Sequence, residues 1–295
     1  MNVLLVGAGR RVSLAEEFVK NGFSVFAYEL GFTVPISSVS TVVKGLKFND
    51  QHLHVDMKYT ITNYKIDLVV PLQDDAVYKC SLITNCKVAC SSAKASEICL
   101  DKVKFEKWCL ANFPQFYPKS TGSYPKIYKP KFGFGSRGIV VARNKSEDPK
   151  LSPDEYVIQK FIDGKEYSVD GYFDLNSKMI DCVPRERIRV ANGEVISSRT
   201  VEFKELQKMT KLIGQRMKLK GPTCFQFIVG QDGKPFIMEI NARFGGGAVL
   251  SMHAGLPLIA MIKKDHFNYD YDYKVGSWKR NVLMERANRE FYYET

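Results

Sequence analysis

The chain has 295 residues, of which 45% are hydrophobic and 25% are charged, a composition typical of a globular protein with about two domains. No apolar run approaches the roughly 20 residues that a membrane-spanning helix needs, and the opening residues lack the basic start of a signal peptide. Seven cysteines without a CxxC pair argue against a zinc site or a disulfide framework, so we expect a cytoplasmic protein.

The net charge of +11, from 43 Lys and Arg against 32 Asp and Glu, indicates an anionic partner. The basic residues are spread along the chain, and one group of them, at positions 126, 129, 131 and 137, is interleaved with glycines. This arrangement favours a phosphorylated small molecule over a nucleic acid. A nucleic-acid-binding module is the alternative, and it would show binding with a steep salt dependence.

The first ninety residues alternate short apolar runs with amphipathic stretches. Residues 3–6, 23–28 and 66–70 are predicted to be strands, and residues 11–21 carry apolar side chains at helical spacing. Strand, helix and strand in this order predict a parallel sheet with right-handed crossovers.

A glycine turn, Gly7-Ala8-Gly9, joins the first predicted strand to the helix, and Glu29 stands at the end of the second strand. This pattern is close to the dinucleotide-binding fingerprint, but Val12 occupies the position of its third glycine. An NAD(P)-binding oxidoreductase is therefore an alternative function.

A predicted helix at residues 101–111 leads into a region of short strands and glycine turns. Here Lys129 precedes a loop in which three glycines surround Ser136, so that backbone amides can approach phosphate groups closely. The loop is not a Walker A motif, because the terminal Gly-Lys-Ser/Thr is missing. The extended segment 159–166 that follows offers an apolar wall for a purine, with Glu166 as an acceptor for ribose hydroxyls.

The strongest hairpin signal is Asp-Gly at residues 232–233, between apolar runs at 225–229 and 235–240. This hairpin places Gln226 opposite the strand that carries Glu239 and Asn241, whose spacing of two puts both side chains on one face. Side-chain oxygens of this kind suit magnesium, and Arg243 shares their parity and can grip a phosphate. A solvated polar face on an edge hairpin is the alternative for this set.

The order and spacing of these segments resemble the ATP-grasp superfamily, and more narrowly the short stand-alone relatives of the carbamoyl-phosphate synthetase large subunit. The resemblance extends over nearly the whole chain. It rests on Asp101-Lys102, on Lys129-Pro130 with the glycine loop, on residues 159–166, on Gln226, and on Glu239-Ile240-Asn241-Ala242-Arg243.

The resemblance implies an α/β fold of the ATP-grasp type, in which a Rossmann-like parallel-sheet domain precedes two α+β lobes that enclose the ATP site. We expect the first domain at residues 1–92, a small lobe with the connector helix and glycine loop at 93–172, and a large lobe with the metal and substrate site at 173–295.

The resemblance also implies a role for each matched residue. Lys102 and Lys129 would contact ATP phosphates beneath a mobile lid that contains Ser136. The adenosine would be held by an adenine slot and a ribose acceptor, formed by Gln159, Phe161, Ile162 and Glu166.

The metal site would hold two magnesium ions, with manganese as a substitute. Gln226, Glu239 and Asn241 would be its ligands, with Glu239 bridging the two ions. Arg243 would stabilise the transferring phosphoryl group, and Arg185 or Arg199 would clamp the substrate carboxylate.

Such enzymes join a carboxylate to an amine through an acyl phosphate and release ADP and phosphate, and dimers are common among them. Ala242 stands where many carbamoyl-phosphate synthetase relatives have proline, and the glycine run 245–247 follows it. Both features favour a ligase for small-molecule carboxylates and amines. A carbamoyl-phosphate-synthetase-like phosphorylating enzyme is the alternative within the superfamily.

Overall fold

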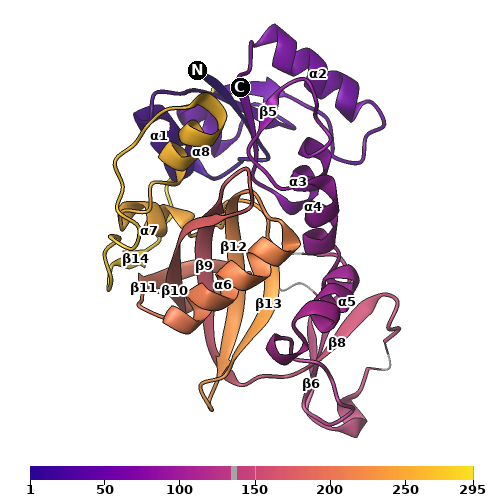
Figure 1. Ribbon diagram of the computed structural model, residues 1–295. Helices are drawn as coiled ribbons and strands as arrows, with labels where there is room; N and C mark the ends of the chain where they lie inside the picture. Colours follow the sequence, from indigo (N-terminus) through magenta and orange to yellow (C-terminus); the bar gives the residue numbers. More distant parts are fainter. Residues whose placement is uncertain (134–137, 150, 295) are drawn as a thin grey trace.

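The computed structural model describes residues 1–133, 138–149 and 151–294 (Figure 1). A five-stranded sheet of order β3-β2-β1-β4-β5 begins the chain, and all its strands are parallel. Its strands are β1 (Asn2–Val6), β2 (Ser24–Glu29), β3 (Thr41–Lys44), β4 (Leu68–Pro71) and β5 (Lys87–Val88). The predicted parallel sheet is therefore confirmed.

Helices connect and follow these strands. The crossovers contain α1 (Val12–Lys20), η1 (Pro35–Ser38), α2 (Leu53–Asn63) and α3 (Asp74–Cys80). After β5 the chain forms α4 (Ala93–Leu100), α5 (Lys102–Asn112) and η2 (Pro114–Phe116). The start of α5 is fixed by Asp101, whose carboxylate accepts hydrogen bonds from the amides of Val103 and Lys104 at 2.9 and 3.1 Å.

Two antiparallel sheets make up the rest of the chain. The smaller has the order β7-β6-β8 and consists of β6 (Lys126–Pro130), β7 (Val140–Ala142) and β8 (Tyr156–Lys160), with η3 (Lys145–Glu147) between the last two. The larger has the order β13-β12-β9-β10-β11-β14. Its strands are β9 (Gly164–Phe173), β10 (Met179–Ala191), β11 (Glu194–Thr200), β12 (Gly221–Gly230), β13 (Pro235–Asn241) and β14 (Leu283–Glu285).

The large sheet carries one long helix on its face. α6 (Lys204–Met217) buries Leu206, Met209 and Ile213 against Phe173 and Phe225 of the sheet. The predicted Asp-Gly hairpin is confirmed as β12 and β13, and Gln226 lies directly opposite Glu239 in their register.

The last helix returns to the amino-terminal sheet (Figure 1). After α7 (Ala248–His253), α8 (Leu258–Phe267) packs its apolar side chains into the core that contains Val3, Leu5 and Phe18. No helix in the described parts of the chain is long and apolar enough to cross a membrane.

The expected boundary between the small lobe and the large lobe, between residues 172 and 173, falls at the end of β9. Because β9 pairs with β10 and β12 over its length, we propose that the small lobe ends at residues 161–163 instead. We also propose that α8 belongs to the amino-terminal domain, because its buried side chains share a core with Val3, Leu5 and Phe18, a core that Tyr172 and Val183 of the large sheet also join.

Candidate nucleotide and metal site

An open cleft lies between the small sheet and the large sheet. Its volume is about 880 Å³ when the solvent at its open mouth is included. The apolar part of its lining comes from both sides, with Ile127 and Ile139 at the small sheet and Phe227, Ile228 and Met238 on the large sheet. Polar and charged side chains line the other parts: Lys102, Lys129, Glu166, Arg187, Gln226 and Glu239. The two sheets can therefore hold a ligand that has both a flat apolar part and a polyanionic part.

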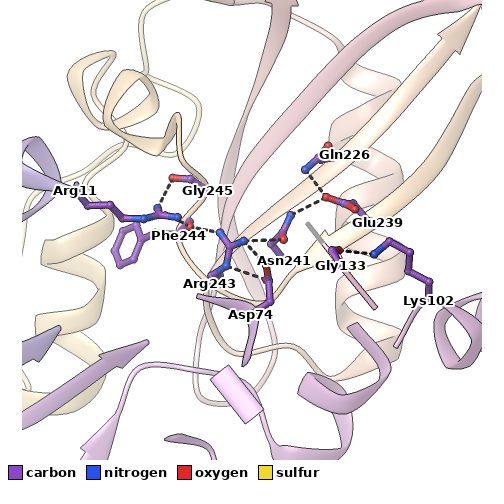
Figure 2. Close-up of polar contacts among 10 residues, drawn as sticks. All are labelled: Arg11, Asp74, Lys102, Gly133, Gln226, Glu239, Asn241, Arg243, Phe244 and Gly245. Atoms are coloured by element: carbon purple, nitrogen blue, oxygen red, sulfur yellow. Dashed lines mark hydrogen bonds and ion pairs between the residues drawn. The ribbon is translucent and has the colours of Figure 1, made fainter. Parts of the chain in front are cut away.

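Four polar side chains form a continuous row along the hairpin (Figure 2). The Gln226 amide donates to the Glu239 carboxylate at 2.5 Å, and the Asn241 amide donates to the same oxygen at 3.4 Å. Arg243 then donates from Nη2 to the Asn241 side-chain oxygen at 3.0 Å. The period of two along β13 and the pairing with β12 bring these groups to one face.

The row contains one carboxylate and two amides, which is a hard-oxygen set with a single negative charge. Rotation about its terminal bond lets each amide present its oxygen to a cation held by Glu239. Magnesium commonly takes one or two carboxylates from protein and its other ligands from phosphates and water. Gln226, Glu239 and Asn241 therefore fit a cation that arrives with a polyphosphate. No group of three His, Cys, Asp or Glu side chains suited to a metal occurs among the described residues.

Arg243 is fixed by a carboxylate from the amino-terminal domain. Its Nε and Nη2 donate to the two oxygens of Asp74 at 2.8 and 2.5 Å, and its Nη1 donates to the Phe244 carbonyl at 3.0 Å (Figure 2). Asp74 is the first residue of α3, immediately beyond the parallel sheet. This bidentate ion pair joins the two domains next to the proposed metal site.

Two lysines approach the same cleft from different elements. Lys102, at the start of α5, donates to the Gly133 carbonyl at 2.7 Å, at the base of the glycine loop. Lys129 on β6 faces the cleft, and no described carboxylate lies within ion-pair distance of its ammonium. Burial lowers the pKa of Lys129 to about 8; the Glu239 carboxylate opposes this shift and Lys102 reinforces it. Ser136, predicted for the lid, lies outside the described residues.

The residues expected in the adenine slot are not among those that line the cleft, as far as the structure describes the chain. Gln159 on β8 points into the protein, with 2% of its surface exposed. Phe161 and Ile162 lie in the link between β8 and β9. The adenine role of these three residues stays a prediction, and we propose the apolar lining of the cleft as a further candidate surface for the adenine.

Glu166 does line the cleft, but it is not free of other partners. Its carboxylate lies 3.0 Å from Nε of Arg187, close enough for an ion pair although not aligned as a hydrogen bond. Arg187 also donates to the Gly193 carbonyl at 3.2 Å. Arg187 lines the cleft with Glu166 and was not among the residues selected from the sequence.

The two arginines expected to clamp a substrate carboxylate are both engaged elsewhere. Arg185 has 1% of its surface exposed, and it donates from Nε and Nη2 to the two oxygens of Asp170 at 2.6 and 3.1 Å. Arg199 on β11 is partly exposed and pairs with Glu186 at 2.8 Å. We therefore correct the expectation for Arg185, which is a buried structural residue. The sequence could not show this burial, because the alternation of a strand places Arg185 and Arg187 on the same face and does not distinguish between them.

The amino-terminal glycine turn is occupied by a side chain of the protein itself. The Glu29 carboxylate accepts the Gly9 amide at 2.7 Å, so the donor that would meet a dinucleotide pyrophosphate is already satisfied. Arg11, two residues after Gly9, donates to the carbonyls of Phe244 and Gly245 at 3.2 Å each. The turn therefore connects the parallel sheet to the segment after β13.

Comparison with known proteins agrees with this geometry. A family model described as an ATP-grasp domain matches residues 99–247, just over half of the chain. A search of curated proteins gives no match.

Solved structures share the fold at low identity. The biotin carboxylase domain of 2-oxoglutarate carboxylase from Hydrogenobacter thermophilus has a TM-score of 0.72 at 13% identity and covers 95% of this chain and 73% of its own. The L-amino acid ligase from Bacillus licheniformis has a TM-score of 0.68 at 17% identity, covering 90% and 74%. The ADP complex of N5-carboxyaminoimidazole synthetase from Staphylococcus aureus has a TM-score of 0.69 at 15% identity, covering 96% and 79%.

The family match begins at the end of α4 and ends just after Arg243, so it includes the small sheet, the large sheet except β14, the cleft between them and the hairpin row. The chain therefore belongs to the ATP-grasp family.

Proposed function

We propose that the protein is an ATP-dependent ligase that joins a small-molecule carboxylate to an amine and releases ADP and phosphate. The observation that carries the proposal is the cleft between the two sheets. There the unpaired Lys129 ammonium and the Glu239 carboxylate lie beside an apolar lining. This combination suits the adenine ring, the phosphates and the accompanying cation of a nucleotide.

The similar structures support the same class of chemistry. The Hydrogenobacter thermophilus domain was solved with MgADP and bicarbonate, and the Bacillus licheniformis protein is an L-amino acid ligase. These substrates are properties of those proteins. What the present chain shares with them is the fold, together with a site that fits a magnesium nucleotide.

The proposed reaction has two steps. A carboxylate oxygen of the substrate attacks the terminal phosphorus of ATP, the bond to the bridging oxygen breaks, and ADP leaves. The amine then attacks the acyl phosphate carbon, phosphate leaves with the bonding electron pair, and the nitrogen loses a proton. Phosphoryl transfer of this kind depends on charge neutralisation and positioning.

The residues of the chain would supply that neutralisation from three sides. Lys102 and Lys129 would hold the phosphates, and Arg243 would contact the group in transfer. Glu239, Gln226 and Asn241 would hold magnesium, which supplies further positive charge to the phosphates when bound. Because this ligand set carries one negative charge, the cation would enter with the nucleotide rather than before it.

Two alternatives are less well supported. A carbamoyl-phosphate-synthetase-like enzyme would share the first step, and Ala242 with the following glycines disfavours it. An NAD(P)-dependent oxidoreductase would use the amino-terminal turn, but Glu29 occupies the Gly9 amide there. The residues that match the ATP-grasp family model, 99–247, do not include that turn.

The test is to replace Glu239 by alanine and measure magnesium-dependent turnover of ATP across a panel of carboxylates and amines. We expect the wild type to release ADP and phosphate only when a carboxylate is present, and Glu239→Ala to lose at least about a hundredfold in rate. Glu205→Ala, at an exposed position of α6, is the control and should retain full activity. Near-normal turnover in Glu239→Ala would disprove the metal assignment, and release of AMP and pyrophosphate would indicate an adenylating enzyme.

A further inference from the structure

Arg11 is a cation at the domain junction without a carboxylate partner. It lies at the start of α1, directly after the glycine turn, and its Nη1 donates to the carbonyls of Phe244 and Gly245 (Figure 2). No carboxylate among the described residues lies within ion-pair distance of its guanidinium, whereas Arg243 is paired with Asp74. Its neighbour Arg10 is exposed to solvent.

The charges around Arg11 do not balance. Arg286 donates to the Gly246 carbonyl at 2.6 Å and lies 3.6 Å from Glu194, and these two charges offset each other. Asp74 offsets Arg243. Burial lowers the pKa of Arg11 to about 10, and the nearby charge of Arg243 adds to this effect. The side chain nevertheless stays protonated at neutral pH, so one positive charge remains in excess.

Arg11 and Arg243 converge on one atom. Both donate from Nη1 to the Phe244 carbonyl oxygen, at 3.2 and 3.0 Å. Because they share this acceptor, the two nitrogens lie no more than about 6 Å apart, a gap that the two oxygens of a carboxylate can bridge. Arg11 and Arg243 are thus two neighbouring cations that have one carboxylate partner in total, Asp74. Such a pair favours the binding of another anion.

We propose that Arg11 and Arg243 together bind the carboxylate of the acceptor substrate, at the junction of the parallel sheet and the β13 strand. This proposal rests on the ligase function proposed above and names the substrate-binding residues of that site. It also replaces Arg185 and Arg199, whose guanidinium groups are engaged with Asp170 and Glu186. The substrate would then lie beyond Asn241 and Arg243, next to the phosphate end of the nucleotide.

The test measures anion binding separately from turnover. Sodium malonate and inorganic phosphate are titrated in turn against the whole protein by calorimetry. Saturating MgADP fills the nucleotide site, and sodium chloride keeps the ionic strength constant. Four proteins are compared: the wild type, Arg11→Gln, Arg11→Lys and Arg10→Gln. Circular dichroism and MgADP affinity establish that each variant is folded.

We expect malonate to bind the wild type and Arg10→Gln equally, Arg11→Gln about tenfold or more weakly, and Arg11→Lys within about threefold of the wild type. Equal binding to Arg11→Gln, equal loss in Arg10→Gln, or the absence of malonate binding to the wild type would each overturn the proposal. Tighter binding of phosphate than of malonate would overturn its assignment to a carboxylate.

The proposed ligase function can fail independently of this result. It fails if the wild type releases no ADP from MgATP with any carboxylate, even where malonate binding depends on Arg11. In an active wild type, Arg11→Gln should raise the KM for the carboxylate about tenfold while the KM for MgATP stays unchanged. An increase in the KM for MgATP of the same size would contradict a role in binding the carboxylate.

Discussion

Lys129, like Lys102, has a cleft-facing ammonium without a carboxylate partner among the described residues. The surrounding protein lowers its pKa to about 8, so its charge changes within the range in which the enzyme can be assayed. A group of this kind connects pH to ligand binding, because a phosphate interacts favourably only with the protonated form.

We therefore predict that the affinity for MgATP is constant from pH 6.5 to 7 and falls as the pH rises through 8. By pH 9 it should be roughly tenfold weaker, as expected for one required proton. The free energy of unfolding changes with pH in the opposite direction. Because the pKa of Lys129 is lower in the folded state than in the unfolded state, stability rises as the pH increases above 8. Equilibrium titration with MgATP at each pH measures the binding effect.

Lys129→Arg is the matched control, because arginine keeps its charge throughout this range and should give a nearly flat affinity profile. A wild-type affinity that does not change between pH 7 and 9 would contradict the assignment of Lys129 to the phosphates.

The sequence predicted only some of the individual residues of the candidate site. Glu239, Asn241 and Arg243 were found because a period of two places them together on one strand, and Gln226 because a hairpin turn fixes its register. Asp74 and Arg11 were missed as partners of this segment. They are 169 and 233 residues from their partners Arg243 and Phe244, and no local pattern encodes a contact between domains.

The glycine run after β13, residues 245–247, packs closely against buried side chains. A Cβ atom on Gly247 would lie 2.5 Å from Nη1 of Arg185, and one on Gly245 would lie 2.7 Å from the Cys224 sulfur and 2.9 Å from an Asp170 oxygen. A Cβ atom on Gly246 would meet nothing within 4 Å. The run therefore packs directly against the buried Asp170–Arg185 ion pair, and Ser251 of α7 donates to the same carboxylate.

We predict that Gly245→Ala and Gly247→Ala each lower the free energy of unfolding by about 1–3 kcal/mol, because neither the ion pair nor the backbone can move aside easily. Gly246→Ala should stay within about 0.5 kcal/mol of the wild type. Urea unfolding followed by circular dichroism measures all three. A loss in Gly246→Ala as large as in the other two would show that backbone flexibility, rather than packing, determines the requirement for glycine.

The sequence connected this run only with the type of ligase, because the residues that surround it in the fold are distant in the sequence. The structure shows its first and third members against a buried ion pair. The elements themselves were predicted more successfully. The helix expected at residues 11–21 is α1 at Val12–Lys20, and the helix expected at 101–111 is α5 at Lys102–Asn112. Their apolar spacing and the Asp101 cap are local signals.

At the scale of the molecule, the chain returns to where it began. α8 contributes Leu258, Ile259, Met261 and Ile262 to the core of the amino-terminal sheet. Nothing in the local sequence distinguishes this helix from one that would cover the large sheet, so the predicted limits assigned it to the large lobe. The fold class, an ATP-grasp arrangement with a preceding parallel sheet, is nevertheless confirmed by the family match and the similar structures.

We predict that Ile262→Ala lowers the stability of the amino-terminal domain by about 2–5 kcal/mol, because its side chain is fully buried in that core. Hydrogen exchange should show loss of protection in β1 and α1, and less loss in β9 and β12. Leu212→Ala, at a position of α6 that is 44% exposed, is the control and should change stability little. Loss of protection confined to the large sheet would refute the placement of α8 in the first domain.

The position of α8 has a consequence for the order in which the protein can mature. The five strands of the parallel sheet are synthesised before α8, the helix that completes one side of their core and follows more than 160 residues after β5. Until it is made, part of an apolar surface that includes Val3, Leu5 and Phe18 lacks its native cover. The sheet therefore cannot complete its core before α8 is made, and we expect nascent chains that stop before α8 to depend most on chaperones.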